Sequence, residues 1–183
     1  MRLSTGHRLG LCSVLVFWLS GCGWQLQTVQ PLPAELLPVY LQLSDTQSLF
    51  ARSLQHSLDV AAMPTTTDLS RAGSVLVVTV DQSTRQVSSV SALNQPQQYQ
   101  MEYRIQYRFD RHLEAVAAHA DTRPITLIPT EALSASRTMS YDITLALAKD
   151  REAHAVEELL ALQLTEQVMR RLNSLSVTVN SVP

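Results

Sequence analysis

Residue types that carry out catalysis occur in this sequence, but their spacing matches no active site. Four histidines lie beyond the N-terminal segment: His56, His112, His119 and His154. None of them forms the H-E-x-x-H pattern of a zinc hydrolase or another close set of ligands, so no metal is predicted. The five glycines stand at positions 6, 10, 21, 23 and 73, whereas phosphate-binding loops and the nucleophile elbow need glycines a few residues apart. The sequence therefore predicts no enzyme activity and no cofactor.

Two features of the charged residues are informative: the overall charge balance and the single lysine. The chain has 14 Lys and Arg against 16 Asp and Glu, and its formal net charge of −2 argues against binding to nucleic acid. Lys149 is the only lysine, and it lies between a predicted strand and a predicted long helix. Composition alone favours a solvated Lys149 paired with Asp150 or Glu152 at the start of that helix, where carboxylates complement the helix dipole.

The N-terminal segment has the pattern of a secretory signal peptide. Arg2 and Arg8 supply positive charge before an apolar run over residues 9–19, which is too short to cross a bilayer. We expect residues 1–21 to be cleaved. Export then places the mature chain in the bacterial envelope.

The end of that segment, Leu19-Ser20-Gly21-Cys22, resembles the bacterial lipoprotein box. The resemblance implies that Cys22 carries lipid, including palmitate, and becomes the first residue of the mature chain. Gly23 follows where an Asp would favour retention in the inner membrane, so the implied location is the periplasmic leaflet of the outer membrane. Residues 22–37, with Pro31 and Pro33, are predicted to form an extended tether from this anchor.

Apolar periodicity divides the remaining chain into strands and helices. The predicted elements are a strand at 39–43, a helix from Ser44 or Asp45 to 62, a strand at 74–92, a turn at 93–98, strands at 98–110 and 125–141, and a helix ending at 173. Their order predicts an α+β fold in which two helices pack on one face of a mixed four-stranded sheet. We expect a single domain over residues 38–173, followed by a flexible tail at 174–183.

Two of these elements show which faces should be buried. In residues 98–110 the odd positions from Tyr99 to Phe109 are apolar or aromatic and the even positions are polar, which predicts one buried face and one wet face carrying Arg104 and Arg108. Pro129 interrupts the next strand, which must lie at an edge or be bulged there. The last helix has an apolar stripe, which Leu159 and Leu162 are expected to widen: Val156, Leu160, Leu164, Val168, Leu172 and Leu175.

Three motifs together resemble the lipopolysaccharide-assembly lipoprotein family, LptE. They are Cys22-Gly23-Trp24-Gln25-Leu26, Tyr99-Gln100-Met101, and Leu147-Ala148-Lys149 with Glu152, the last followed by a leucine-rich helix ending in Arg170-Arg171-Leu172. The resemblance implies a lipid-anchored protein that plugs an LptD-type outer-membrane β-barrel and helps it fold. Its domain then faces the periplasm and the barrel lumen, and the pair delivers lipopolysaccharide to the cell surface.

The same resemblance implies direct contact with lipopolysaccharide through Lys149. The family has a second basic position before Tyr99, but residues 91–98 of this chain are uncharged. The contact expected from that second position therefore shifts to Arg85, Arg104 or Arg137. The candidate binding residues are therefore Lys149, Arg137, Arg104 and Arg108. An alternative is an accessory lipoprotein of another envelope transport system that binds an amphipathic ligand or a protein partner.

Overall fold

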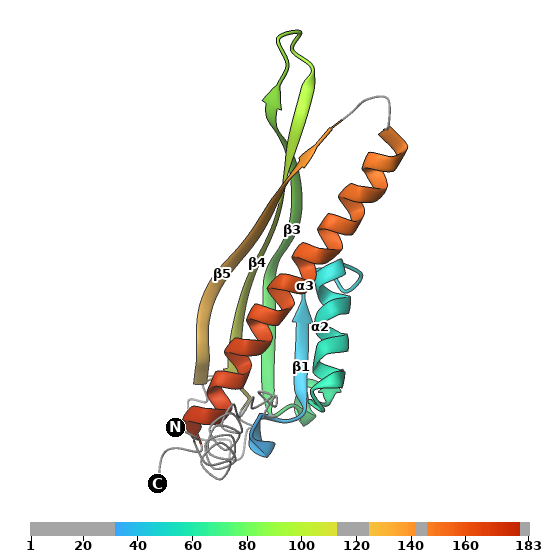
Figure 1. Cartoon of the computed structure of the whole chain (residues 1–183). Helices are drawn as coiled ribbons and strands as arrows, with labels where there is room; N and C mark the ends of the chain where they lie inside the picture. The colour runs from blue at the N-terminus through green and yellow to red at the C-terminus, as the bar shows by residue number, and fades with distance from the viewer. Residues whose placement is uncertain (1–31, 113–124, 142–145, 180–183) are drawn as a thin grey trace, which may run out of the picture.

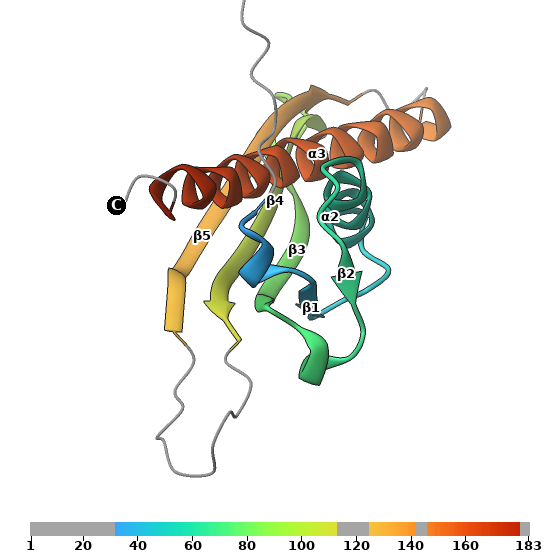
Figure 2. The same cartoon turned by 90° about the horizontal axis from the view of Figure 1, so that it is seen from below.

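The computed structural model describes residues 32–112, 125–141 and 146–179. Its elements in chain order are η1 (Ala34–Leu36), β1 (Val39–Leu43), α2 (Leu49–Val60), β2 (Thr65–Thr66), η2 (Leu69–Arg71), β3 (Ser74–Val90), β4 (Pro96–Arg111), β5 (Ile125–Ser140) and α3 (Ala146–Val179). The strands form one sheet, and α2 and α3 lie against the same face of it (Figures 1 and 2). The predicted α+β fold with two helices on one face of a mixed sheet is confirmed.

The sheet has the strand order β2-β1-β3-β4-β5. Strand β1 runs parallel to β2 and β3, whereas β3, β4 and β5 are antiparallel. The fifth strand, which the sequence did not predict, is the two-residue β2 in the threonine run after Pro64. Because β1 ends opposite Val78, the sheet narrows to β3, β4 and β5 toward the β3–β4 turn at residues 91–95 (Figure 1). We call this narrow end, with the start of α3, the distal end.

The hydrophobic core lies between the sheet and the two helices. Phe50, Leu54 and Leu58 from α2 are fully buried, as their spacing predicted. From β4 the core takes five side chains: Met101, Tyr103, Ile105, Tyr107 and Phe109. From α3 it includes Leu160, Leu164, Val168 and Leu172. Burial of one continuous cluster of large apolar side chains supplies the main driving force for this packing.

Both expectations for Pro129 are confirmed. Strand β5 is the last strand of the sheet, so Pro129 lies at an edge. The register also shifts there, because Phe109 pairs with Ile128 while Tyr107 pairs with Glu131. A proline lacks the N–H of a ladder hydrogen bond, and an edge position with a bulge accommodates it.

Two other expectations, the cap of α2 and the end of α3, were wrong. Helix α2 is capped by Ser48, whose Oγ accepts the N–H of Ala51 at 2.9 Å, and not by Ser44 or Asp45. The carboxylate of Asp45 is instead used in a local turn, where it accepts the N–H of Gln47 at 2.8 Å. Helix α3 continues to Val179, past the predicted boundary at 173.

The predicted width of the α3 stripe was also wrong. Leu159 and Leu162 are 46% and 45% exposed, whereas Leu160 and Leu164 are 3% and 0% exposed. At 100° per residue, Leu159 and Leu162 lie on the side of the helix away from the sheet. They therefore form part of the outer surface of α3 and not of the core.

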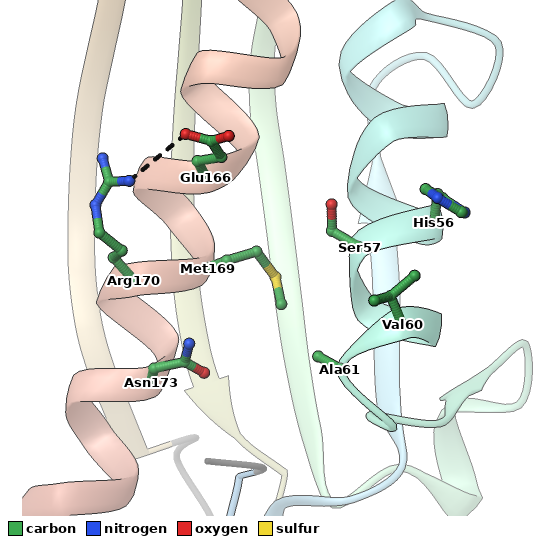
Figure 3. Close-up of a pocket in the computed structure, with 8 residues that line it drawn as sticks. All are labelled: His56, Ser57, Val60, Ala61, Glu166, Met169, Arg170 and Asn173. Carbon is green, nitrogen blue, oxygen red and sulfur yellow. Dashed lines mark ion pairs between the residues drawn. The ribbon is translucent and has the colours of Figure 1, made fainter. Parts of the chain in front are cut away.

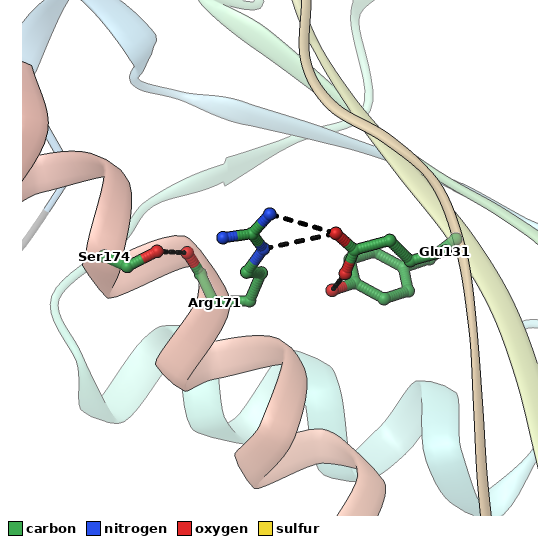
Figure 4. Close-up of polar contacts among 4 residues, drawn as sticks. Glu131, Arg171 and Ser174 are labelled. Carbon is green, nitrogen blue, oxygen red and sulfur yellow. Dashed lines mark hydrogen bonds and ion pairs between the residues drawn. The ribbon is translucent and has the colours of Figure 1, made fainter.

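Two clusters of side-chain hydrogen bonds join the helices to the sheet. At the start of α2, Asp81 of β3 accepts hydrogen bonds from Ser48 Oγ and from Tyr103 Oη, the latter at 2.7 Å. Near the end of α3, Arg171 donates to Glu131 Oε1 of β5 at 3.0 Å (Figure 4). Tyr107 Oη of β4 donates to the other carboxylate oxygen, Glu131 Oε2, at 3.0 Å. These contacts fix where each helix lies along the sheet, since each joins one helix to particular strand residues.

Candidate functional site

The distal end brings charged residues from α3, β3 and β5 close together. Lys149 lies in the first turn of α3, where its Nζ donates to Glu152 Oε2 at 2.8 Å and to Ser140 Oγ, at the end of β5, at 3.3 Å. Its side chain is only 17% exposed, whereas that of Glu152 is 49% exposed. The pairing with Glu152 expected from the sequence is confirmed, and Lys149 in addition joins α3 to β5.

Arg85 of β3 forms the second charged contact at this end. Its guanidinium lies 3.6 Å from Asp150 Oδ1 of α3 and 5.3 Å from the centre of the Tyr99 ring. Tyr99 in turn meets Tyr141 edge-on, with the ring centres 5.0 Å apart. The side chains of Arg85 and Asp150 are 47% and 66% exposed, so this ion pair is accessible to a competing anion. A cation over an aromatic ring keeps its orientation without losing its charge.

Arg137 lies in the same row of the sheet as Arg85. Met101 of β4 pairs with Arg85 on one side and with Arg137 of β5 on the other. Directly opposite residues in antiparallel strands share a face, so both arginines flank the buried Met101 on the side of the sheet that faces the helices. Within the part of the chain that the structure describes, the exposed Arg137 has no hydrogen bond or ion pair. Two paired cations, Lys149 and Arg85, and one cation without a partner among the described residues, Arg137, therefore lie at the distal end.

Arg104 and Arg108 are not part of this group. They alternate with the core residues of β4 and lie on the opposite face of the sheet, as the sequence predicted. Arg104 pairs with Glu102 at 2.9 Å, and Arg108 pairs with Asp110 at 2.7 Å. The fold thus divides the four candidate binding residues between two faces: Lys149 and Arg137 on one, Arg104 and Arg108 on the other.

The sheet face that carries Arg104 is polar from edge to edge. The residues paired with Gln100, Glu102 and Arg104 on β3 and β5 are all polar and exposed: Gln82, Thr84, Gln86, Ser134, Ser136 and Thr138. Asp110, also expected to be wet, is only 4% exposed, because it lies beside a register shift and is covered by Arg108. We call this surface the polar sheet face; its residues are Gln82, Thr84, Gln86, Gln100, Glu102, Arg104, Ser134, Ser136 and Thr138.

A groove between α2 and α3 is separate from the distal end. It has a volume of about 440 Å³ and is lined by His56, Ser57, Val60, Ala61, Glu166, Met169, Arg170 and Asn173 (Figure 3). Glu166 and Arg170 form an ion pair at 3.7 Å along α3.

The remaining sequence-based candidates are placed as follows. Cys22, the predicted lipid attachment point, lies outside the described residues, and so does His119. Within residues 32–112, 125–141 and 146–179, no three His, Cys, Asp or Glu side chains converge on a position for a metal ion. In those same ranges none of the helices is both long enough and apolar enough to cross a membrane.

Sequence reasoning missed the aromatic part of the distal end. Tyr99 was expected in the core, but it is half-buried and lies between Arg85 and Tyr141. Nothing in the spacing of residues 98–110 indicates this contact. It depends on the register of β3 against β4 and on the path of the chain after β5.

The fold is shared with small bacterial lipoproteins of known structure. The chain superimposes on rare lipoprotein B from Shewanella oneidensis with a TM-score of 0.60, 18% identity and coverage of 78% of this chain and 98% of that one. The corresponding values for lipoprotein B from Nitrosomonas europaea are 0.63, 15%, 87% and 94%. For the minor lipoprotein from Acinetobacter baumannii they are 0.57, 14%, 76% and 92%. The chain therefore belongs to this structural class of compact α+β domains.

The family follows from the sequence itself. Residues 36–172 match the family model described as "LptE: Lipopolysaccharide-assembly", which covers most of the chain, and no curated protein matches the chain significantly in sequence. The protein is a member of the LptE family and has a role in lipopolysaccharide assembly. The resemblance based on the three sequence motifs is confirmed.

Proposed function

We propose that this protein is a non-enzymatic lipoprotein of the outer membrane that plugs an LptD-type β-barrel and helps it assemble. Membership of the lipopolysaccharide-assembly family is the observation that carries the proposal. The signal-peptide pattern and the Cys22 motif support an anchor in the periplasmic leaflet. Of the predicted tether at residues 22–37, the last part belongs to the folded domain, because Leu32 and Leu36 are buried in its core, so the proposed tether is residues 22–31. The domain then faces the periplasm and the barrel lumen.

The polar sheet face supports the role of a plug. The lumen of a large outer-membrane barrel is lined with polar side chains, so a protein inside it needs a wet outer surface. Exposed Gln, Ser, Thr and Arg side chains and the partly exposed Glu102 cover three neighbouring strands of this sheet, and the apolar side chains that alternate with them are turned toward the helices. In this arrangement Arg104 and Arg108 contact the barrel wall and not the glycolipid.

The distal end is the proposed contact for lipopolysaccharide. Lys149, Arg137 and Arg85 supply cations from three elements, and phosphate groups on a glycolipid form strong charge-assisted hydrogen bonds with such side chains. Arg85 takes the place of the basic position that is absent from residues 91–98. The chain is acidic as a whole, but local fields decide contacts of this kind.

Gentle extraction of the tagged full-length protein tests the plug. We expect a large outer-membrane β-barrel protein to co-purify, and depletion of this protein should lower the amount of lipopolysaccharide at the cell surface. Arg104→Glu should weaken the capture, since it reverses a charge on the polar sheet face. Arg170→Glu is the matched control, because Arg170 is 66% exposed on α3, close to the 61% of Arg104.

Two results would contradict the proposal. Failure to recover a barrel partner would contradict the role of a plug. An unchanged level of surface lipopolysaccharide after depletion would favour the alternative function, an accessory lipoprotein of another transport system. For the glycolipid contact, Lys149→Gln should weaken binding of lipopolysaccharide while the circular dichroism spectrum stays that of the folded domain. Unchanged affinity would exclude Lys149 as a contact.

A further inference from the structure

We infer that Asp150 and Glu152 are attenuators of the distal cation site, which consists of Lys149, Arg85 and Arg137: they lower its affinity for anions. In the unliganded protein they form ion pairs with Arg85 and Lys149, and a phosphorylated glycolipid displaces them when it binds. This inference rests on the proposed lipopolysaccharide contact and adds a specificity device to it. Its starting point is that the first turns of α3 supply both a cation of the site, Lys149, and the carboxylates that neutralise two of its cations.

The contacts at Lys149 show what a ligand must replace. Nζ donates to Glu152 Oε2 at 2.8 Å and to Ser140 Oγ at 3.3 Å, and the side chain is only 17% exposed. An ammonium group has three donors, so a phosphate oxygen can use the remaining one only in competition with the nearby Glu152 charge. The Glu152 side chain is 49% exposed, so it can turn into solvent without leaving a buried charge behind.

The contacts at Arg85 have the same design. Asp150 holds the guanidinium at 3.6 Å, which is a loose ion pair, and 66% of the Asp150 side chain is exposed. The ring of Tyr99 keeps the guanidinium in place from another direction. Loss of Asp150 to solvent therefore frees Arg85 for a phosphate while its position is retained. Arg137, which has no partner among the described residues, is available to an anion from the start.

This arrangement makes the binding reversible, which suits a site that passes its ligand on. A bare cluster of three cations would hold a polyanion tightly. Ion pairs that solvent can reach are weak, so the carboxylates lower the affinity without closing the site. They also discriminate, because an uncharged amphiphile gains nothing from displacing them, whereas a phosphate replaces the lost ion pair with a stronger contact.

The test compares binding of lipopolysaccharide, and of the same lipopolysaccharide after dephosphorylation, to the purified full-length protein and its variants. We expect Glu152→Gln and Asp150→Asn each to raise the affinity for the phosphorylated form by up to about fivefold, and less at high salt. The dephosphorylated form should show no gain. Glu166→Gln is the matched control: it removes one negative charge from α3, paired with Arg170, about 20 Å along the helix from Glu152.

A double-mutant cycle separates attenuation from a purely structural role. In the Lys149→Gln background, Glu152→Gln should no longer raise the affinity, because the carboxylate acts through Lys149. If Lys149→Gln weakens binding but neither carboxylate variant strengthens it, the attenuator inference is overturned and the glycolipid contact stands. If lipopolysaccharide does not bind, or Lys149→Gln leaves its affinity unchanged, the proposed contact fails and the inference fails with it.

Discussion

The face that α3 turns toward the sheet can be tested with two leucines that are two residues apart. Leu164 is fully buried in the core, whereas Leu162 is 45% exposed on the outside of the same helix. Replacing Leu164 with alanine removes three buried carbon atoms and leaves a cavity, for which core Leu→Ala changes cost about 2.7–5 kcal/mol. Leu162→Ala removes the same atoms from a surface position and should change the free energy of unfolding by less than about 1 kcal/mol.

Equilibrium unfolding in urea measures both values. A native domain of this size is stable by about 5–15 kcal/mol, so Leu164→Ala should remain folded with a clearly lower transition midpoint. At about 2–4 °C per kcal/mol, its melting temperature should fall by roughly 5–20 °C. Equal losses for the two variants would show that both leucines are in the core, as the sequence pattern predicted, and would refute the orientation of α3 described above.

Three further predictions concern single contacts. Gly73→Ala should destabilise the fold by roughly 1–3 kcal/mol in urea unfolding, because a Cβ there would lie 2.7 Å from Glu35 O and 2.7 Å from the carbonyl carbon of Leu36. Glu131→Gln should cost roughly 1 kcal/mol in the same assay, since it removes the charged partner of Arg171. Burial, together with the hydrogen bond to Asp81, raises the pKa of Tyr103 well above its usual value. The unfolded phenol ionises near pH 10, so stability should fall above about pH 10, and fall less in Tyr103→Phe.

Each of these predictions has an outcome that contradicts it. A Gly73→Ala protein as stable as the wild type would mean that the chain near Leu36 can move away. A Glu131→Gln protein with unchanged stability would show that the Arg171 contact contributes nothing to the docking of α3. For Tyr103, equal alkaline loss of stability in the wild type and in the phenylalanine variant would show that its phenol is not protected by the fold.

Much of the fold could be predicted from local patterns. The alternation in residues 98–110 specifies a strand with a buried and a wet face, and β4 has both. The apolar stripe from Val156 to Leu172 specifies a helix packed on one side. Pro129, which interrupts the apolar pattern of β5, specifies an edge strand or a bulge. These predictions succeed because strand and helix periods translate directly into side-chain direction.

The errors occurred where several residues competed for one role. Ser44, Asp45 and Ser48 can all cap a helix, and Ser48 is the cap in the fold, where its Oγ also meets Asp81 of β3. Leu159 and Leu162 are apolar, but the sheet and α2 cover less than the full apolar arc of α3. Local propensity ranks such candidates, and tertiary contacts choose among them.

The candidate site divides in the same way. The sequence by itself determined that Lys149 is paired with a nearby carboxylate, that Arg104 and Arg108 face away from the core, and to which family the chain belongs, because these depend on neighbours in the chain. Only the tertiary structure decided that Arg85 meets Asp150 and that Arg137 shares its row. Those residues are brought together by strand register and by the path of α3 across the sheet, which are set by packing of the whole core.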